Sequence, residues 1–298
     1  MRRLAAQTAV QWAARHSNRG IWYRRQAIVL CEALSASLPA YMPDQPTITQ
    51  DILARLASSK ELEAAQLVIE WAALTSERDA SRLARHVAAL AHSDHPESQG
   101  DVMKPPTGLL LQGPDRQLQI TPHGLNVQRK ITGDFRRDWN RTREYLERKW
   151  QPLYAAVSKY VQPNFIGFIV LVEVSTDSQP FRASEIINAF FRSMKVGTPV
   201  DAEFRVAFTV AERYLVNLTL STYTKYKVTV RMENGKMTQT QEKVDEGLNV
   251  RVDVNSKLNV FLNRGPIALT SDDFARILEL TSDALGHDKF TAFLGGWE

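Results

Sequence analysis

The sequence predicts an α+β protein, an N-terminal all-helical domain followed by an α+β domain with a mainly antiparallel sheet. Apolar residues recur at helical spacing in the first third of the chain, and the period changes to two over 202–262. Between these regions, residues 93–108 lose periodicity and are rich in Pro, Gly, Ser and charge, as is typical of a linker. We therefore expect a helical domain over 1–92, a linker over 93–108 and an α+β domain over 109–298.

The first domain is expected to contain about five helices. The first ends before Ser17, and three prolines over 39–46 separate the second from the third, because proline removes a backbone donor and fixes φ. The remaining helices are expected over 21–38, 52–56, 61–74 and 79–91.

The second domain is expected to open with a hairpin that turns at 122–124, followed by a helix from Asp134. At 100° per residue, Trp139 and Trp150 share the apolar face of this helix, so both are expected to be buried. Pro152 is expected to break or kink the helix. Residues 165–172 are apolar at nearly every position, which predicts a central strand covered on both faces.

An antiparallel meander is expected over 202–262, and a short buried helix before it, over 186–194. Asn234-Gly235 predicts a hairpin turn, since both residues tolerate positive φ. The strand that returns from Lys236 to Lys243 is almost entirely polar and is expected to be an exposed edge. A last helix is expected to begin at Thr270 with a capping motif.

Composition excludes several classes of protein. The 298 residues are 44% hydrophobic and 23% charged, and no apolar run approaches the roughly 20 residues that span a bilayer, so no membrane contact is expected. The single cysteine, Cys31, cannot form an intramolecular disulfide, which favours a cytoplasmic protein. Local motifs for phosphate loops, nucleophile elbows and zinc proteases are missing from the sequence. We therefore expect no cofactor or metal, and the sequence favours a protein without enzyme activity over an enzyme, without deciding between them.

Positive charge is concentrated in two segments, although the net charge is only +4. Residues 1–31 hold six arginines and no acid, and residues 129–150 hold eight bases against four acids. Arginine suits bidentate contact with phosphate, and nucleic-acid affinity depends largely on phosphate neutralisation. The candidate nucleic-acid-binding residues, including one strand face with an aromatic, are Arg129, Lys130, Arg137, Arg141, Arg148, Tyr223, Lys225, Lys227 and Arg231.

The same residues have plainer interpretations. Acids four residues away can pair with the helix arginines, and lysines on an edge strand prevent sheet association. The leading hypothesis is a non-enzymatic protein that binds nucleic acid, alone or within an assembly. The alternatives are an interaction or scaffold subunit, which could pair with a partner or a second copy through the edge from Lys236 to Lys243, and an enzyme whose site is assembled from distant residues.

Overall fold

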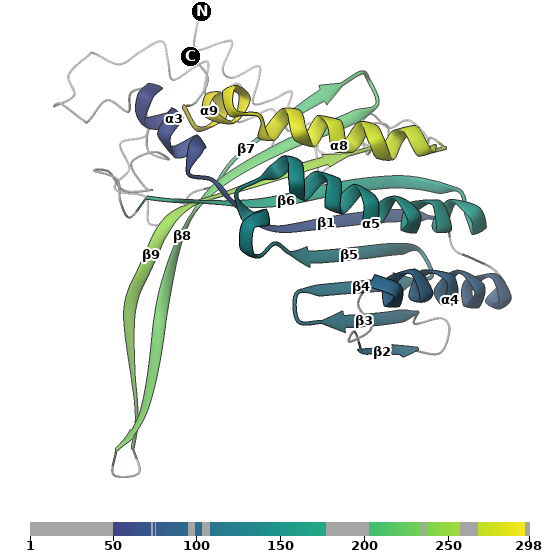
Figure 1. Cartoon of the computed structure of the whole chain (residues 1–298), viewed down its shortest axis with the longest axis horizontal. Coiled ribbons are helices and arrows are strands. Elements are labelled where there is room, and N and C mark those ends of the chain that lie inside the picture. Colours follow the sequence, from purple (N-terminus) through teal and green to yellow (C-terminus); the bar gives the residue numbers. More distant parts are fainter. Residues whose placement is uncertain are drawn as a thin grey trace, which may run out of the picture. The chain divides into compact units, whose positions relative to one another are not determined.

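The computed structural model describes residues 50–72, 74, 76–94, 99–102, 108–176, 203–233, 236–256 and 268–295, all in one compact unit. Within them, nine strands form a single antiparallel sheet in the order β2-β3-β4-β5-β1-β6-β9-β8-β7 (Figure 1). The strands are β1 (Glu61–Trp71), β2 (Gln99–Val102), β3 (Leu109–Gly113), β4 (Arg116–Thr121), β5 (Gly124–Lys130), β6 (Pro163–Ser175), β7 (Glu203–Val210), β8 (Tyr214–Glu233) and β9 (Lys236–Asn255). The helices expected before residue 49 and over 186–194, Cys31 and the Asn234-Gly235 turn lie outside the described residues.

The helices lie over one face of this sheet (Figure 1). They are α3 (Gln50–Ser58), α4 (Glu77–Asp94), the short 3-10 helix η1 (Gly133–Arg136), α5 (Trp139–Tyr160), α8 (Ser271–Leu285) and α9 (His287–Gly295). Alternate side chains of each strand point toward them and form the core. One apolar row crosses eight strands in register: Leu111, Leu118, Val127, Leu67, Phe168, Val254, Val216 and Phe208.

The prediction of an all-helical domain over 1–92 is wrong, because β1 lies within it. This strand pairs with β5 on one side and β6 on the other, near the middle of the sheet. Its Glu, Ala and Leu residues favour a helix locally, and a bulge between Leu62 and Ala64 disturbs the period of two at the start of the strand. From Ala65 onward every second residue is buried, so partners on both sides outweigh local propensity.

The segment predicted to be a linker, 93–108, contains β2, which pairs with β3. The strands before this segment and those after it therefore belong to the same sheet. The described residues form a two-layer α+β structure, in which helices cover one face of a single sheet. The predicted fold, a helical domain followed by an α+β domain, is therefore wrong.

The antiparallel meander is confirmed. Strands β7, β8 and β9 pair in sequence order, and β9 is one continuous strand of 20 residues that extends well beyond the expected strand from Lys236 to Lys243. β7 pairs with β8 only as far as Ser221, and β6 pairs with β9 only from Gly247 onward. Among the residues that the structure describes, the far halves of β8 and β9 pair only with each other, and they project from the sheet as a two-stranded arm (Figure 1).

The helix α5 is continuous through Pro152, so the expected break is absent. The proline side chain is on the exposed side of the helix, where the carbonyl oxygen of Arg148 that loses its donor can meet water. Trp150 is buried against the sheet, as expected, whereas Trp139 is only half-buried.

The capping motif expected at Thr270 is confirmed as a capping box with Asp273 at the start of α8. Among the described helices, none combines the length and hydropathy required to cross a membrane.

Candidate functional site

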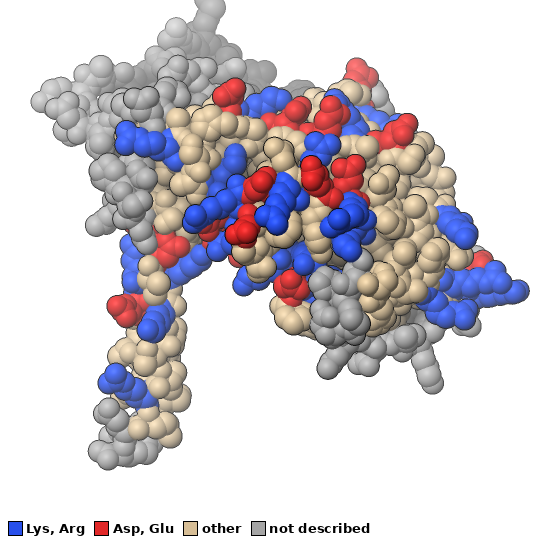
Figure 2. All heavy atoms as spheres, viewed as in Figure 1, with Lys and Arg blue, Asp and Glu red and all other residues tan. Residues whose placement is uncertain are grey.

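The basic residues predicted on β5 and α5 are mostly paired with acids. Three lie at ion-pairing distance from a carboxylate: Arg129 from Asp115 (3.4 Å), Arg137 from Glu61 (2.6 Å) and Arg141 from Asp134 (3.8 Å). Lys130 and Arg148 are exposed and form no ion pair within the described part of the chain. Paired arginines release fewer counterions when they meet a polyanion, so this surface is weaker than its arginine content suggests. Figure 2 shows acids interspersed with bases over the helices.

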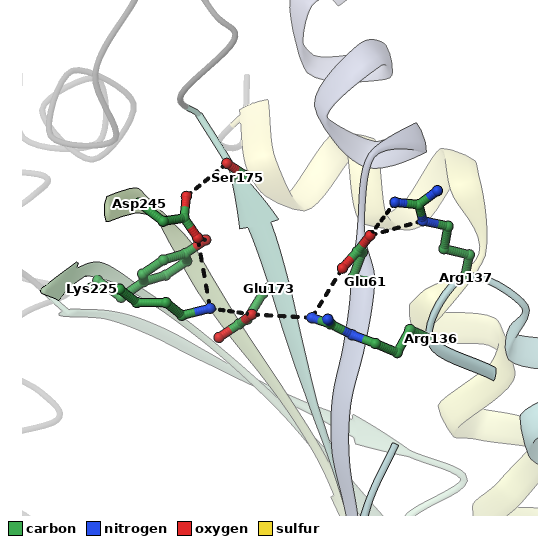
Figure 3. Close-up of polar contacts among 8 residues, drawn as sticks. Glu61, Arg136, Arg137, Glu173, Ser175, Lys225 and Asp245 are labelled. Atoms are coloured by element: carbon green, nitrogen blue, oxygen red, sulfur yellow. Dashed lines mark hydrogen bonds and ion pairs between the residues drawn. The ribbon is translucent and has the colours of Figure 1, made fainter. Parts of the chain in front are cut away.

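Another predicted residue, Lys225, belongs to a polar cluster where the arm leaves the sheet (Figure 3). The predicted residue Tyr223 belongs to the same cluster through its hydrogen bond to Asp245. Lys225 Nζ lies 2.7 Å from Glu173 Oε2 and 3.7 Å from Asp245 Oδ2. Tyr223 donates to Asp245 Oδ2 at 2.9 Å, and Ser175 donates to the other oxygen at 2.9 Å. We call these five residues the arm root; they tie β6, β8 and β9 together.

Charge pairing continues from the arm root toward the helices. Glu173, largely buried, is 3.4 Å from Arg136 on η1, and Arg136 is 3.0 Å from Glu61 on β1. Arg137 contacts the same Glu61, so bases and acids alternate along the whole series (Figure 3). With Lys225 and Asp245 included, three bases meet three acids. The series is neutral and joins five elements, which fits a structural role.

The pKa shifts of Tyr223 and Lys225 favour the protonated forms that make the contacts of the arm root. Burial raises the pKa of Tyr223, and its hydrogen bond to Asp245 raises it further, so the phenol stays protonated. Burial lowers the pKa of Lys225, but the hydrogen bond and charge of Glu173 outweigh this effect and hold the pKa above its ordinary value. Lys225 therefore remains a cation bound to two acids.

Gly247 allows the Tyr223 ring to lie directly on β9. A Cβ atom at this position would stand 2.2 Å from the carbonyl oxygen of Val174 and 2.9 Å from the Tyr223 ring. Any larger residue would force these strands apart. The arm is thus fixed at its root by ring packing as well as by charge.

Beyond the root, the arm has two different faces. Large apolar side chains are exposed on one face: Tyr226, Val228, Val230 and Met232 on β8, and Met237 on β9. The other face carries Lys227 and Arg231, the last two predicted residues, together with Thr229. Lys227 is opposite Glu242, and neither basic side chain forms an ion pair within the described residues. Within the described residues, the strand from Lys236 to Lys243 forms an open edge, because β9 is paired there only with β8.

A basic surface that the sequence analysis missed lies at the junction of α4 and α5. Arg78, Arg82 and Arg85 are exposed on α4, and Lys159 is exposed near the end of α5. Arg82, Arg85 and Lys159 line a depression of about 520 Å³ together with His86 and Tyr160, whose rings meet edge to face at 5.8 Å. Figure 2 shows basic side chains gathered over these ends of the two helices. We call the four cations the α4–α5 basic surface.

The four cations of this surface have no acidic partner among the described residues. The spacing of four and then three residues between Arg78, Arg82 and Arg85 puts them on one helix face, and this signal was present in the sequence. What the sequence could not show is that Lys159 and Tyr160, more than 70 residues later, lie beside them.

The sheet face opposite the helices is polar. The register aligns Gln112, Gln117, Gln128 and Gln66 across four strands, followed by Ile169, Asp253 and Asn217. In β6 the side chain of Leu171 is 37% exposed, so the expectation of a strand covered on both faces is wrong for the described residues. An open face of this kind is ordinary for an antiparallel sheet.

Two shallow depressions on the open face share Glu63, Leu171 and Arg251, and the smaller has a volume of about 320 Å³. In the smaller depression the polar side chains pair with one another: Arg251 lies 3.7 Å from Asp253, and Arg205 donates to Asn217 at 3.3 Å. The described residues contain no group of three or more His, Cys, Asp or Glu that could hold a metal ion. The geometry of this face indicates neither a nucleophile with a base nor a cofactor cradle in the part described.

Comparison with known proteins gives no assignment. No protein-family model matches the chain, and no curated protein matches it.

Proposed function

We propose that this protein binds nucleic acid without catalysis, and that the α4–α5 basic surface is its main phosphate contact. The observation that carries the proposal is the set of four exposed cations, Arg78, Arg82, Arg85 and Lys159, without an acidic partner in the described residues. Unpaired cations retain their full charge for a polyanion, and their association with phosphates releases condensed counterions.

The arrangement of the surface supports a polyanion over a single phosphate. Successive arginines on one helix face are about 5–6 Å apart, so the row extends over several phosphates of a strand. Tyr160 and His86 add aromatic rings at the edge of the row, and rings of this kind can stack on unpaired bases. Contacts of this type position a nucleic acid without reading its sequence.

The phosphate contacts proposed here are not the residues that the sequence predicted. Acids pair with Arg129 on β5, with Arg137 just after η1 and with Arg141 on α5, and on the arm Lys225 pairs with Glu173. Lys130, Arg148, Lys227 and Arg231 stay available as secondary contacts. The nine predicted residues therefore remain a prediction, and the experiment below tests three of them, Arg137, Arg141 and Arg148.

The test compares two triple variants of the full chain. Arg78→Gln with Arg82→Gln and Arg85→Gln removes the α4 row, and Arg137→Gln with Arg141→Gln and Arg148→Gln removes the row predicted on α5. Both lose three positive charges, and Arg and Gln have similar helix propensities. Binding of labelled single-stranded and duplex oligonucleotides is followed by fluorescence anisotropy over a salt series.

The α4 variant should bind every sequence more weakly, and the slope of log affinity against log salt should fall by about one for each phosphate that is no longer neutralised. The α5 variant should change much less. An equal or larger loss of affinity in the α5 variant would return the site to the residues predicted from the sequence. If the unaltered protein does not bind at low salt, nucleic-acid binding is rejected.

A second candidate function is supported by a different observation, the apolar face of the arm. Exposed apolar patches with polar surroundings mark protein contacts, and an open strand edge can pair with another chain. The arm therefore favours an interaction subunit, independently of the α4–α5 basic surface.

A further inference from the structure

The arm ends in a strip of apolar side chains that the described residues leave uncovered. Tyr226, Val228, Val230, Met232 and Met237 have exposed fractions of 56%, 49%, 55%, 71% and 71%. We call them the apolar strip. Alternation along β8 places its four members on one face, and the register places Met237 beside Met232. Figure 2 shows the arm as mostly uncharged surface with a few isolated charges.

An uncovered strip of this kind is unfavourable for an arm of two strands. A two-stranded ribbon is marginal in water unless a third element packs on its apolar face. The root of this arm is fixed by the Tyr223 ring on Gly247 and by the Lys225 ion pairs, but these contacts do not reach beyond Tyr226. We therefore expect another element to pack on the apolar strip. Because the arm root holds the strip in one orientation, less conformational entropy is lost when a partner binds.

We propose that the occupant is the apolar strip of a second copy of this chain, so that two arms pack face to face about a two-fold axis. The inference rests on the second candidate function and not on nucleic-acid binding. The order along β8 is large, small, small, large: Tyr226, Val228, Val230, Met232. In an antiparallel arrangement Tyr226 of one copy meets Met232 of the other, an aromatic against a flexible thioether, and the valines meet in the middle.

Charge and area both fit a second copy. Among the cross-strand partners of the strip, Lys243 is charged, whereas Gln239 and Gln241 are neutral, and Lys227, Arg231 and Glu242 are on the opposite face. The face thus offers little to a polyanion or a charged peptide, and two copies can meet without strong repulsion. The exposed part of the strip amounts to roughly 600 Å² per copy, so a symmetric pair buries about 1,200 Å², at the lower end of specific interfaces.

The test measures the oligomeric state of the full chain by sedimentation velocity over a concentration series. Val230→Lys puts a charge in the middle of the strip, where the two-fold axis brings two such charges together. Thr229→Lys is the matched control, since it adds the same charge to the adjacent position on the opposite face. Circular dichroism and thermal melting establish that both variants remain folded.

The unaltered protein and Thr229→Lys should dimerise reversibly, and Val230→Lys should weaken dimerisation by at least about tenfold, because a buried unpaired charge is costly. A dimer that Val230→Lys leaves unchanged would overturn the inference, because the interface would lie elsewhere. A monomer at high micromolar concentration would also overturn it.

If the protein is a monomer, hydroxyl-radical oxidation of Met232 and Met237 shows whether the apolar strip is covered by the chain itself or exposed to solvent. In a dimer, both methionines should be protected only at concentrations where the dimer forms. Protection in a monomer would mean that the chain covers its own strip, which rejects the second candidate function as well. Free oxidation in a monomer would reject the second copy and leave the strip open to a different protein.

Discussion

At the scale of single residues, Asp273 is a buried carboxylate with hydrogen-bond donors on both of its oxygens. It is buried, its Oδ1 accepts from Arg213 Nε at 2.7 Å and from Tyr214 at 2.6 Å, and its Oδ2 accepts from the Thr270 amide at 2.7 Å. Burial alone would raise the pKa of Asp273, but the hydrogen bonds from Arg213 and Tyr214 lower it below the ordinary value. One side chain thus caps α8 and joins it to the start of β8.

Replacing Asp273 with Asn should lower the free energy of unfolding by about 2–4 kcal/mol, because it removes charged hydrogen bonds from a buried site. The pKa of Asp273 is lower in the folded chain than in the unfolded chain. Its contribution is therefore complete above pH 3.8 and is lost as the pH falls through the lowered value. Urea unfolding at several pH values should show a smaller loss of stability in acid for Asp273→Asn. Asp272→Asn, an exposed neighbour in the same turn, should behave like the unaltered protein.

At the scale of elements, Trp150 is one of the buried side chains that attach α5 to the sheet. Its ring is 3% exposed and lies 5.5 Å from the Phe168 ring on β6, between centroids. Trp139 is also on the apolar face, but it sits at the start of the helix, where its Nε1 donates to Ser282 Oγ at 2.9 Å. The helical period identified the face correctly, but it could not show how far α8 covers each end of it.

Trp150→Ala should therefore destabilise the protein by about 3–5 kcal/mol, as large aromatic core residues do. Trp139→Ala should cost less, about 1–2 kcal/mol, because its ring is only partly buried and one hydrogen bond is removed. Urea unfolding followed by circular dichroism avoids the change in fluorescence that both substitutions cause. Equal costs would show that the two ends of α5 are covered alike.

At the scale of the whole molecule, the position of β1 decides how the chain can be divided. β1 and β2 are contributed by the part before residue 103, and their neighbours β5, β6 and β3 by the part after residue 107. A cut in this segment would leave β5 and β6 with unpaired inner edges. The two parts contribute two and seven strands to one sheet and should not fold separately.

When residues 1–104 and 105–298 are produced together as two chains, they should purify as one complex and unfold in a single transition. Produced alone, each should lack a cooperative transition, since neither has the strands to close the core. Calorimetry and circular dichroism of each chain provide the measurement. A separately stable, helical 1–104 would contradict the single sheet and restore a domain boundary in this region.

Part of the candidate site could have been predicted from the sequence. The spacing of Arg78, Arg82 and Arg85 is a plain helical row, and the alternation from Tyr226 to Met232 is a plain apolar strand face. The pairing of Arg137 with Glu61, 76 positions apart, and of Lys225 with Glu173, 52 positions apart, could not be predicted. Periodicity gives the face of an element on which a side chain lies, but not the element that meets that face.

The sequence by itself determined the elements whose signals are local: the hairpin of β4 and β5, the helices α4, α5 and α8, the capping box at Thr270, and the meander from β7 to β9. Only the tertiary structure decided the rest. β1 is a strand because two neighbours supply its hydrogen bonds, and α5 passes Pro152 because the freed carbonyl faces solvent. The tertiary structure also determined which arginines are available for a ligand, because folding places acids beside some arginines and not beside others.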